Sequence, residues 1–311
     1  MQSRRISRAA ALGLLAVFAL QAAVAAEQKE PKQHVEQKYL RVQTGDKDEP
    51  VALQTAIVSY VGKNPKGQPV VVDLVGVVHI ADRAYYEKLN KLFVSYDAVL
   101  YELVAPKGTK VPKGGGEKRI RHPLTAMQRM MQSVLQLDYQ LDQIDYTKKN
   151  FVHADMSPDE FAESMKERDE SFLKMFFRMI GQSAAMQGRP GSMSDAQLLA
   201  ALFAKDRSLQ LKRLMSRQFE QMEVMLVGFG GPDGSTIITE RNKKALSVLE
   251  SELASGKKRL AIFYGAGHLS DMDQRMRANF GMSRVKATWL TAWGMEDKSP
   301  KAEVEKDGEA D

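Results

Sequence analysis

The sequence predicts an α/β (α+β) protein with a central mixed, largely parallel sheet that is built from two chain segments and split by a helical insert. Two observations support this fold class. Residues 70–78 and 98–103 are apolar runs separated by a helical pattern, and a strand–helix–strand unit of about 30 residues implies parallel pairing. Helical periodicity then fills residues 124–227, and strands alternate with helices again only after Thr239.

Composition narrows the class of protein. The chain has 311 residues, of which 43% are apolar and 27% charged, values typical of a soluble globular protein rather than a disordered or fibrous one. It has no cysteine, which excludes a disulfide scaffold, a thiol nucleophile and a Cys-ligated zinc site. Any bound metal must therefore use histidine and carboxylate ligands.

The N-terminus predicts export. Three arginines precede an apolar run at residues 9–20, and small residues lead up to Ala26. The run is too short to span a bilayer, so we interpret residues 1–26 as a signal peptide that is cleaved near Ala26. The expected location is periplasmic or extracellular. An uncleaved anchor is the alternative, and a peripheral association with the membrane is left open.

Charge argues against nucleic acid as a partner. The net charge is +6, and residues 1–26 hold three arginines and no acids, so the mature chain carries +3. This charge makes no strong electrostatic case for nucleic-acid binding. We expect a peptide or small-molecule substrate instead, and the sequence does not indicate an oligomeric state.

The first α/β segment follows a polar lead-in. Residues 39–61 alternate as a half-buried strand does, and residues 63–67 form a turn. The β-branched run at 70–78 is typical of a strand buried on both faces. A helical pattern from Ala84 to Phe93 comes next, before the strand at 98–103. The Gly-rich stretch at 106–121 has no phosphate-loop spacing and is predicted to be a loop.

The helical insert covers about residues 124–228. Three apolar stripes at helical spacing predict its helices, and a short strand is predicted at 150–155. Ser157-Pro158-Asp159-Glu160 is typical of a helix start. We interpret the methionines of this region as fillers of gaps between helices, with a substrate-gripping lid as the alternative.

The second α/β segment closes the domain, which is expected to span residues 39–294. Its helices and strands are predicted in the order helix, strand, turn, helix and strand, followed by a charged, structureless tail at 295–311. Their ranges are 240–254, 259–264, 265–268, 269–278 and 285–293.

The candidate site residues follow the apolar strands. Gly76-Val77-Val78-His79 ends one strand and Gly265-Ala266-Gly267-His268 ends another. We expect Gly76 and Gly265 to let the backbone turn sharply, so that both histidines point into the crevice at the carboxyl edge of the sheet. Glu102 follows the strand that we expect to lie next to the one ending at His79.

These three side chains suit a divalent metal. His79, His268 and Glu102 would bind Mn²⁺, Co²⁺ or Zn²⁺ and leave a position for water, whose pKa the metal lowers. Arg241 and Asn242 begin a helix whose apolar stripe aims its first turn at the sheet. Arg241 is therefore expected to stabilise negative charge on the substrate, with a purely structural ion pair to Glu102 as the alternative.

His153 and Asp155 end the third short strand. Because they are two residues apart, they are expected to face the same side of the sheet, where they would support the site. A direct role as metal ligands and a purely structural role are the alternatives. No Gly-x-Ser-x-Gly elbow is present, so seryl hydrolysis has little support.

Four short motifs resemble the TraB/GumN family, which includes the TIKI proteases and is related to erythromycin-esterase-like and ChaN-like proteins. They occur in the family's order, although Asp155-Met156 stands where many relatives have Glu-Thr. The motifs are Gly76-Val77-Val78-His79, the strand Tyr96-Asp97-Ala98-Val99-Leu100-Tyr101-Glu102, Glu240-Arg241-Asn242 and Gly265-Ala266-Gly267-His268-Leu269.

The resemblance implies a split α/β fold and a metal-dependent peptidase or related hydrolase that uses the two histidines, Glu102 and Arg241. Two alternatives remain open at this point. The same crevice would hold haem or another small ligand in a ChaN-like binding protein, or the chain would be a catalytically degenerate member of the family.

Overall fold

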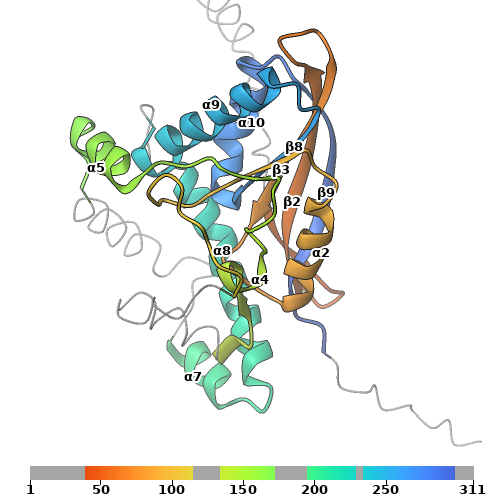
Figure 1. The fold of residues 1–311 in the computed structure, drawn as a ribbon. Coiled ribbons are helices and arrows are strands. Elements are labelled where there is room, and N and C mark those ends of the chain that lie inside the picture. The colour runs from red at the N-terminus through yellow and green to blue at the C-terminus, as the bar shows by residue number, and fades with distance from the viewer. Residues whose placement is uncertain (1–38, 115–133, 172–194, 229–233, 298–311) are drawn as a thin grey trace, which may run out of the picture. The chain divides into compact units, whose positions relative to one another are not determined.

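The computed structural model describes residues 39–114, 134–171, 195–228 and 234–297, all of which belong to one compact unit. Seven strands form its main sheet, and helices cover both faces (Figure 1). The predicted signal peptide lies outside the described residues, as does the charged tail beyond Asp297. None of the helices in the described part is long and apolar enough to cross a membrane.

The antiparallel half of the sheet is arranged around β2 (Pro50–Lys63). Along one edge β2 pairs with β9 (Ser283–Gly294), and along its other edge it pairs first with β1 (Leu40–Thr44) and then with β3 (Pro69–Val77). The single alternating stretch predicted at 39–61 is thus a hairpin of two strands. Its turn is at residues 45–49, where the polar sequence Gly-Asp-Lys-Asp-Glu interrupts the alternation.

The parallel half has the order β3-β8-β5-β7. The strand β8 (Arg259–Gly265) lies between β3 and β5 (Ala98–Tyr101), and β7 (Phe151–His153) pairs with the outer side of β5. All four run in the same direction, so their carboxyl ends meet at one edge of the sheet. The predicted fold class is confirmed. The prediction that β5 neighbours β3 is wrong, because a strand from the second segment inserts between them.

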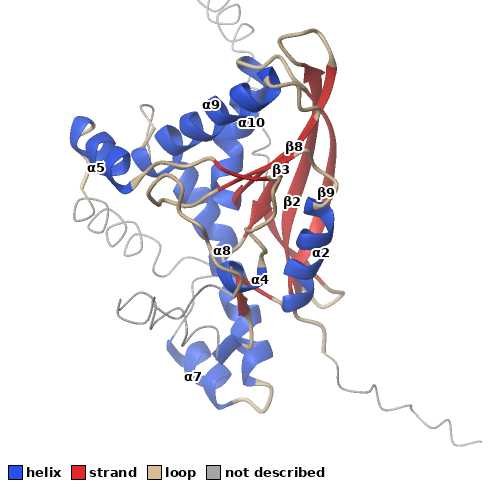
Figure 2. Ribbon diagram, in the orientation of Figure 1, coloured by secondary structure: helices blue, strands red, loops and turns tan. Residues whose placement is uncertain are grey.

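The sheet has an apolar core on each of its two faces. Helices lie on both sides of the sheet (Figure 2). The helix α2 (Arg83–Phe93) packs on one face through Tyr85, Tyr86, Leu89 and Phe93. The helices α9 (Arg241–Ala254) and α10 (Leu269–Ala278) cover the other face. The predicted stripe of α9 is confirmed, since Asn242, Leu246, Leu249 and Leu253 are all buried. This packing fixes the first turn of α9 against the carboxyl edge of the sheet.

The segment predicted as a helical insert returns to the main sheet at β7. Before β7, the short strand β6 (Asp138–Tyr139) pairs with β4 (Ile80–Ala81) and leads into α4 (Gln140–Gln143). After β7 come α5 (Pro158–Glu167), α7 (Asp195–Phe203) and α8 (Arg207–Gly228). The predicted stripe at 124–135 lies mostly outside the described residues, and so does the predicted linker at 181–193.

Candidate functional site

The carboxyl edge of the parallel strands brings four of the predicted residues together. Glu102 follows β5, Asp155 lies two residues beyond β7, and His268 ends the short 3₁₀-helix η3 (Ala266–His268) that follows β8. Arg241 reaches them from the start of α9. The side chains of Asp155, Arg241, Glu102 and His268 are 0%, 10%, 11% and 7% exposed, so this cluster is shielded from bulk water.

Arg241 is the centre of the cluster. Its Nε and Nη2 donate to the two carboxylate oxygens of Asp155 at 2.9 and 2.6 Å, and Nη2 also donates to Oε1 of Glu102 at 2.6 Å. Its Nη1 lies 3.5 Å from Nε2 of His268. The ion pair with Glu102, which was the structural alternative for Arg241, is present, and Asp155 provides the better-matched, two-point partner for the guanidinium. The prediction did not include this pairing of Asp155.

Both glycines allow close packing. The expected sharp turn is wrong for Gly76, which lies inside β3, whereas the chain does turn at Gly265, where β8 ends and η3 begins. Gly265 has φ of −50° and Gly76 is not among the described glycines with positive φ, so neither needs the left-handed region. A Cβ on Gly265 would lie 3.3 Å from Oε2 of Glu102, which accepts the Gly265 N–H at 2.7 Å. A Cβ on Gly76 would lie 3.1 Å from the Ala56 carbonyl oxygen and 3.1 Å from the Leu269 side chain.

Asn242 determines the tautomer of His268. The Asn242 amide nitrogen donates to the His268 carbonyl oxygen at 3.0 Å and to Asp271 at 2.8 Å, and both are acceptors only. Its amide oxygen must therefore face Nδ1 of His268, 2.7 Å away, so Nδ1 carries the proton. The lone pair of Nε2 is then directed towards Arg241 and Glu102, whose Oε1 is 3.6 Å away.

His79 lies apart from this core and is the exposed member of the site. Its Nδ1 is 2.9 Å from Oε1 of Gln140, and its carbonyl oxygen accepts the Gln140 backbone N–H at 2.9 Å. The Gln140 amide nitrogen in turn donates to the hydroxyl of Tyr146 at 2.8 Å. Among the described residues, no hydrogen-bond partner contacts Nε2 of His79.

His153 does not join the cluster, and it does not share a role with Asp155. Its Nε2 donates to the Leu103 carbonyl oxygen at 2.6 Å, and its ring lies 5.6 Å from that of Tyr101. The strand β7 ends at His153, so the alternation that would align it with Asp155 does not continue. His153 therefore supports the loop after β5, while Asp155 turns towards Arg241.

Charge and burial set the ionisation of the cluster. Burial and the positive charge of Arg241 lower the pKa of His268 to about 4, although Glu102 opposes this shift. Burial disfavours the ionised form of Glu102. His268 is protonated in the acid range where Glu102 titrates, and its positive charge, together with that of Arg241, holds the pKa of Glu102 well below its usual range. At neutral pH, His268 is therefore neutral and Glu102 is ionised.

The cluster consequently carries one negative charge in excess. Glu102 and Asp155 are two carboxylates bonded to the single guanidinium of Arg241, and His268 contributes no charge at neutral pH. A buried, unbalanced charge is costly unless a counter-ion balances it. The site is therefore suited to a cation or to a positively charged group of a ligand.

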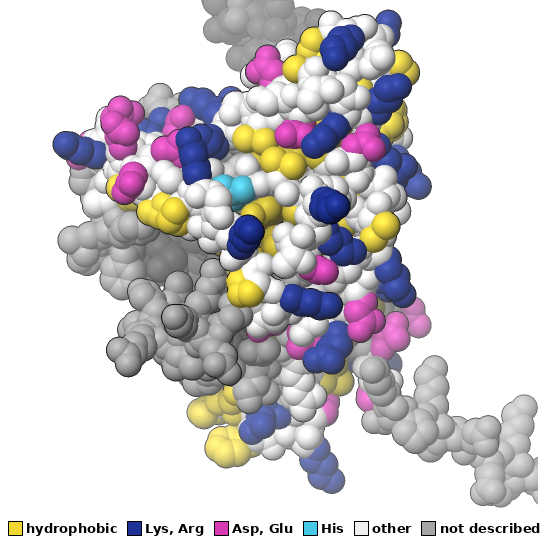
Figure 3. Space-filling model, viewed as in Figure 1, with side chains coloured by type: hydrophobic (Ala, Val, Ile, Leu, Met, Phe, Trp, Pro, Cys, Tyr) yellow, Lys and Arg dark blue, Asp and Glu magenta, His cyan; other side chains and the backbone are white. Residues whose placement is uncertain are grey.

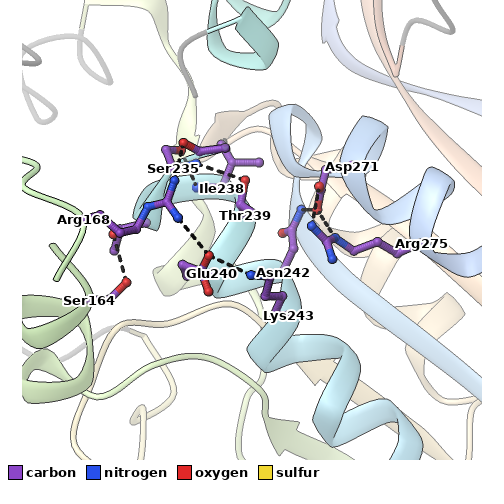
Figure 4. A network of polar contacts seen from close by, with 12 residues as sticks. Ser164, Arg168, Ser235, Ile238, Thr239, Glu240, Asn242, Lys243, Asp271 and Arg275 are labelled. Carbon is purple, nitrogen blue, oxygen red and sulfur yellow. Dashed lines mark hydrogen bonds and ion pairs between the residues drawn. The ribbon is translucent and has the colours of Figure 1, made fainter. Parts of the chain in front are cut away.

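A second polar network holds the start of α9 in place (Figure 4). The π-helical turn η2 (Thr236–Glu240), which sequence reasoning did not predict, precedes α9. Arg168 pairs with Glu240 at 3.3 Å and donates to the Gly234 carbonyl oxygen, and Ser164 bonds the Thr236 hydroxyl at 2.9 Å. These contacts tie the end of α5 to the turn that positions Arg241.

Gln140, Tyr146 and Asp271 are the residues of the site that sequence reasoning missed. Gln140 and Tyr146 lie in the insert, where no strand end or motif marks them, and Asp271 lies in the first turn of α10. The proximity of Asp271 to the Gly-x-x-His motif could have suggested it. Nothing local could have suggested Gln140, because β6 and α4 bring it to His79 from a distant part of the chain.

The wider surface does not locate the site by itself. Two cavities of the described part, of ≈640 and ≈500 Å³, are lined by none of the cluster residues. The face seen in Figure 3 carries a histidine beside apolar side chains, with acidic and basic side chains interspersed around it.

Among the described residues, no three His, Asp or Glu side chains stand in metal-binding geometry, and the Arg241 guanidinium lies among Glu102, Asp155 and His268.

Comparisons with known proteins found no match: no family model, no curated protein and no solved structure is similar to this chain.

Proposed function

We propose that this protein is an exported, metal-dependent hydrolase, a peptidase of the TraB/GumN type. The observation that carries the proposal is the buried cluster at the carboxyl edge of the sheet, whose two carboxylates outnumber its one guanidinium. Ligand sites of open α/β sheets lie at this edge. Three of the four motifs that resemble the family contribute Glu102, Arg241 and His268 to this cluster, and the fourth contributes His79, which we propose joins them when a metal binds.

The three side chains are of the types that bind divalent metals, and binding would require them to rearrange from the positions that they occupy among the described residues. His268 presents an Nε2 lone pair, Nε2 of His79 is free of protein partners in the described part, and Glu102 stays ionised at neutral pH. Two imidazoles and one carboxylate are a donor set of catalytic zinc sites, and Mn²⁺ and Co²⁺ also accept such ligands. When bound, the metal would supply a water of lowered pKa for attack on a carbonyl.

The other side chains orient the site and balance its charge. Asp155 holds Arg241 through two hydrogen bonds, so the guanidinium remains in place when Glu102 binds a second cation. Arg241 is then a fixed, always-charged donor for an oxygen that becomes negative in the substrate. The low pKa of Glu102 makes it a weak proton acceptor at neutral pH, which favours a ligand role over a general-base role.

The test combines metal analysis with a peptide-library cleavage assay on the mature protein, with Mn²⁺, Co²⁺ or Zn²⁺ added singly. We expect His79→Ala, Glu102→Gln and His268→Ala each to remove most metal binding and turnover. Their effects should not add, because residues that act as a unit fail together. Arg241→Lys should keep the metal and lose turnover, since an ammonium cannot reproduce the planar donor fork.

Glu163→Gln is the matched control, because Glu163 is exposed on α5 and has no contact with the cluster. It should leave both metal content and cleavage unchanged. If the three cluster variants keep the metal content of the wild type and lower only thermal stability, the cluster is a structural network and the hydrolase proposal fails. A visible absorption band on adding haem, without metal-dependent cleavage, would support the ligand-binding alternative instead.

A further inference from the structure

The two histidines of the site differ in how firmly their partner amides are held. Asn242 donates to two groups that only accept, so its orientation and the Nδ1–H form of His268 are fixed. Gln140 contacts Nδ1 of His79 and the hydroxyl of Tyr146, and each of these can donate or accept. The amide of Gln140 therefore has two orientations that satisfy both partners.

The two orientations place protons differently. In the first, Nδ1–H of His79 donates to Oε1 of Gln140, the Gln140 amide nitrogen donates to Tyr146, and the phenol proton of Tyr146 is left for another acceptor. In the second, the amide is turned over, Tyr146 donates to Gln140, Gln140 donates to Nδ1, and His79 carries its proton on Nε2. Only the first orientation leaves Nε2 of His79 with a lone pair for a metal.

Tyr146 is buried in an aromatic stack next to the strand that ends at the site. It is 7% exposed, and its ring packs 5.0 Å from that of Tyr101 and 5.6 Å from that of Phe151. Tyr101 is the residue directly before Glu102, so this packing places Tyr146 beside the end of β5. Burial raises the pKa of Tyr146 well above its usual range, so the hydroxyl keeps its proton at neutral pH. Gln140 is the partner that occupies its oxygen.

We propose that Gln140 is a positioning residue that couples His79 to Tyr146: a metal on Nε2 of His79 selects the first amide orientation and so frees the phenol proton of Tyr146 to donate to the substrate. Tyr146 would then be a second donor for the oxygen that becomes negative, in addition to Arg241. The substrate part of this inference rests on the proposed function, whereas the coupling between the two residues does not.

The coupling is tested by long-range ¹H–¹⁵N NMR of the histidine side chains in the full mature chain. His268 should carry its proton on Nδ1 both without metal and with Zn²⁺. His79 should show both tautomers without metal and only Nδ1–H with Zn²⁺. Gln140→Glu, which accepts from both partners, should give Nδ1–H at His79 without any metal. The control Gln136→Glu, an exposed position four residues away, should behave as wild type. A single His79 tautomer in the metal-free wild type, or no response to Gln140→Glu, overturns the coupling.

The donor role is tested by turnover of a peptide from the library with Zn²⁺ present. Tyr146→Phe should lower kcat about 100-fold and leave Zn²⁺ affinity unchanged, as loss of one such donor does. Gln140→Glu should produce a similar loss, because its carboxylate accepts the hydrogen bond of the Tyr146 hydroxyl. The variant with both Gln140→Glu and Tyr146→Phe should be no slower than Tyr146→Phe alone. Tyr101→Phe removes a neighbouring hydroxyl from the same aromatic stack and should leave kcat unchanged.

The outcomes separate the two proposals. If Zn²⁺ never binds His79, or if no peptide is cleaved, the proposed function fails, while the metal-free comparison of wild type with Gln140→Glu still decides the coupling. If peptides are cleaved and Tyr146→Phe is fully active, the hydrolase proposal stands and the donor role of Tyr146 is wrong.

Discussion

At the scale of single residues, Asp155 is the side chain on which the site depends. It is fully buried and provides two of the hydrogen bonds of Arg241, which is itself 90% shielded at its side chain. An asparagine at position 155 would place an amide NH2 against one of the Arg241 N–H groups, so a buried donor would lose its acceptor although Glu102 still balances the charge of Arg241. Glu102 cannot replace Asp155, because one of its oxygens already accepts the Gly265 amide.

We therefore expect Asp155→Asn to lower the free energy of unfolding by about 2 kcal/mol. The measurement is denaturant unfolding with Asp159→Asn as control, since Asp159 is exposed at the start of α5 and should change stability by less than about 1 kcal/mol. Equal effects of the two substitutions would show that the Asp155–Arg241 pair contributes nothing specific.

The lowered pKa of His268 predicts a pH dependence of stability. Between pH 4 and 6.5 the unfolded chain binds a proton at this histidine and the folded chain does not, so acidification favours unfolding. The contribution of His268 to the free energy of unfolding should be constant above pH 6.5. The free energy of unfolding should then fall by roughly 3 kcal/mol as the pH drops to 4. The depressed pKa of Glu102 adds a further loss only below its ordinary value near 4.5.

His268→Gln isolates this contribution. In metal-free protein, thermal unfolding of the wild type between pH 4 and 7 should show a steep decline, and the variant should show a shallower one. Parallel curves for the two proteins would mean that His268 is not held neutral by burial.

At the scale of elements, the orientation of α5 matters because its end supports the turn before α9. Ser157 accepts the Glu160 N–H, and the Glu160 side chain accepts the Ser157 N–H, so the first turn of α5 is closed by a capping box. Lys244 of α9 also pairs with Glu160 at 2.9 Å. The start of α5 is thus linked to α9, and its end is linked to η2.

Ser157→Ala should cost about 1 kcal/mol, because it removes the acceptor for the Glu160 amide. Amide exchange within α5 should become about fivefold faster, the factor that corresponds to this energy. Ser247→Ala is the control, since Ser247 lies in the exposed middle of α9 and bonds only to a carbonyl of its own helix. Unchanged exchange in α5 after Ser157→Ala would contradict the capping role.

At the scale of the whole molecule, the first described residue, Tyr39, begins the unit that contains the sheet, and the predicted export signal lies before it. The basic start, apolar run and small residues predict cleavage after Ala26. Mass spectrometry of the protein recovered from the expressing cells should give a chain that starts at Glu27. An intact Met1, or a cytoplasmic location of the folded protein, would contradict export.

Local sequence pattern determined most of the elements. The run at 70–78, the helix at 269–278 and the helix start at Ser157 agree with β3, α10 and α5 to within a few residues. Strand periodicity, turn residues and capping boxes act between near neighbours, so they can be read from a short window. The same local patterns predicted that His79, Glu102 and His268 follow the ends of strands.

Only the tertiary structure decided how these ends meet. The insertion of β8 between β3 and β5, the pairing of Asp155 with Arg241 and the contact of Gln140 with His79 join residues that are far apart in the chain. Which strand pairs with which, and which buried charge finds which partner, depends on the packing of all elements at once. No local pattern encodes that choice, because the free energy of each contact depends on the burial that the complete fold provides.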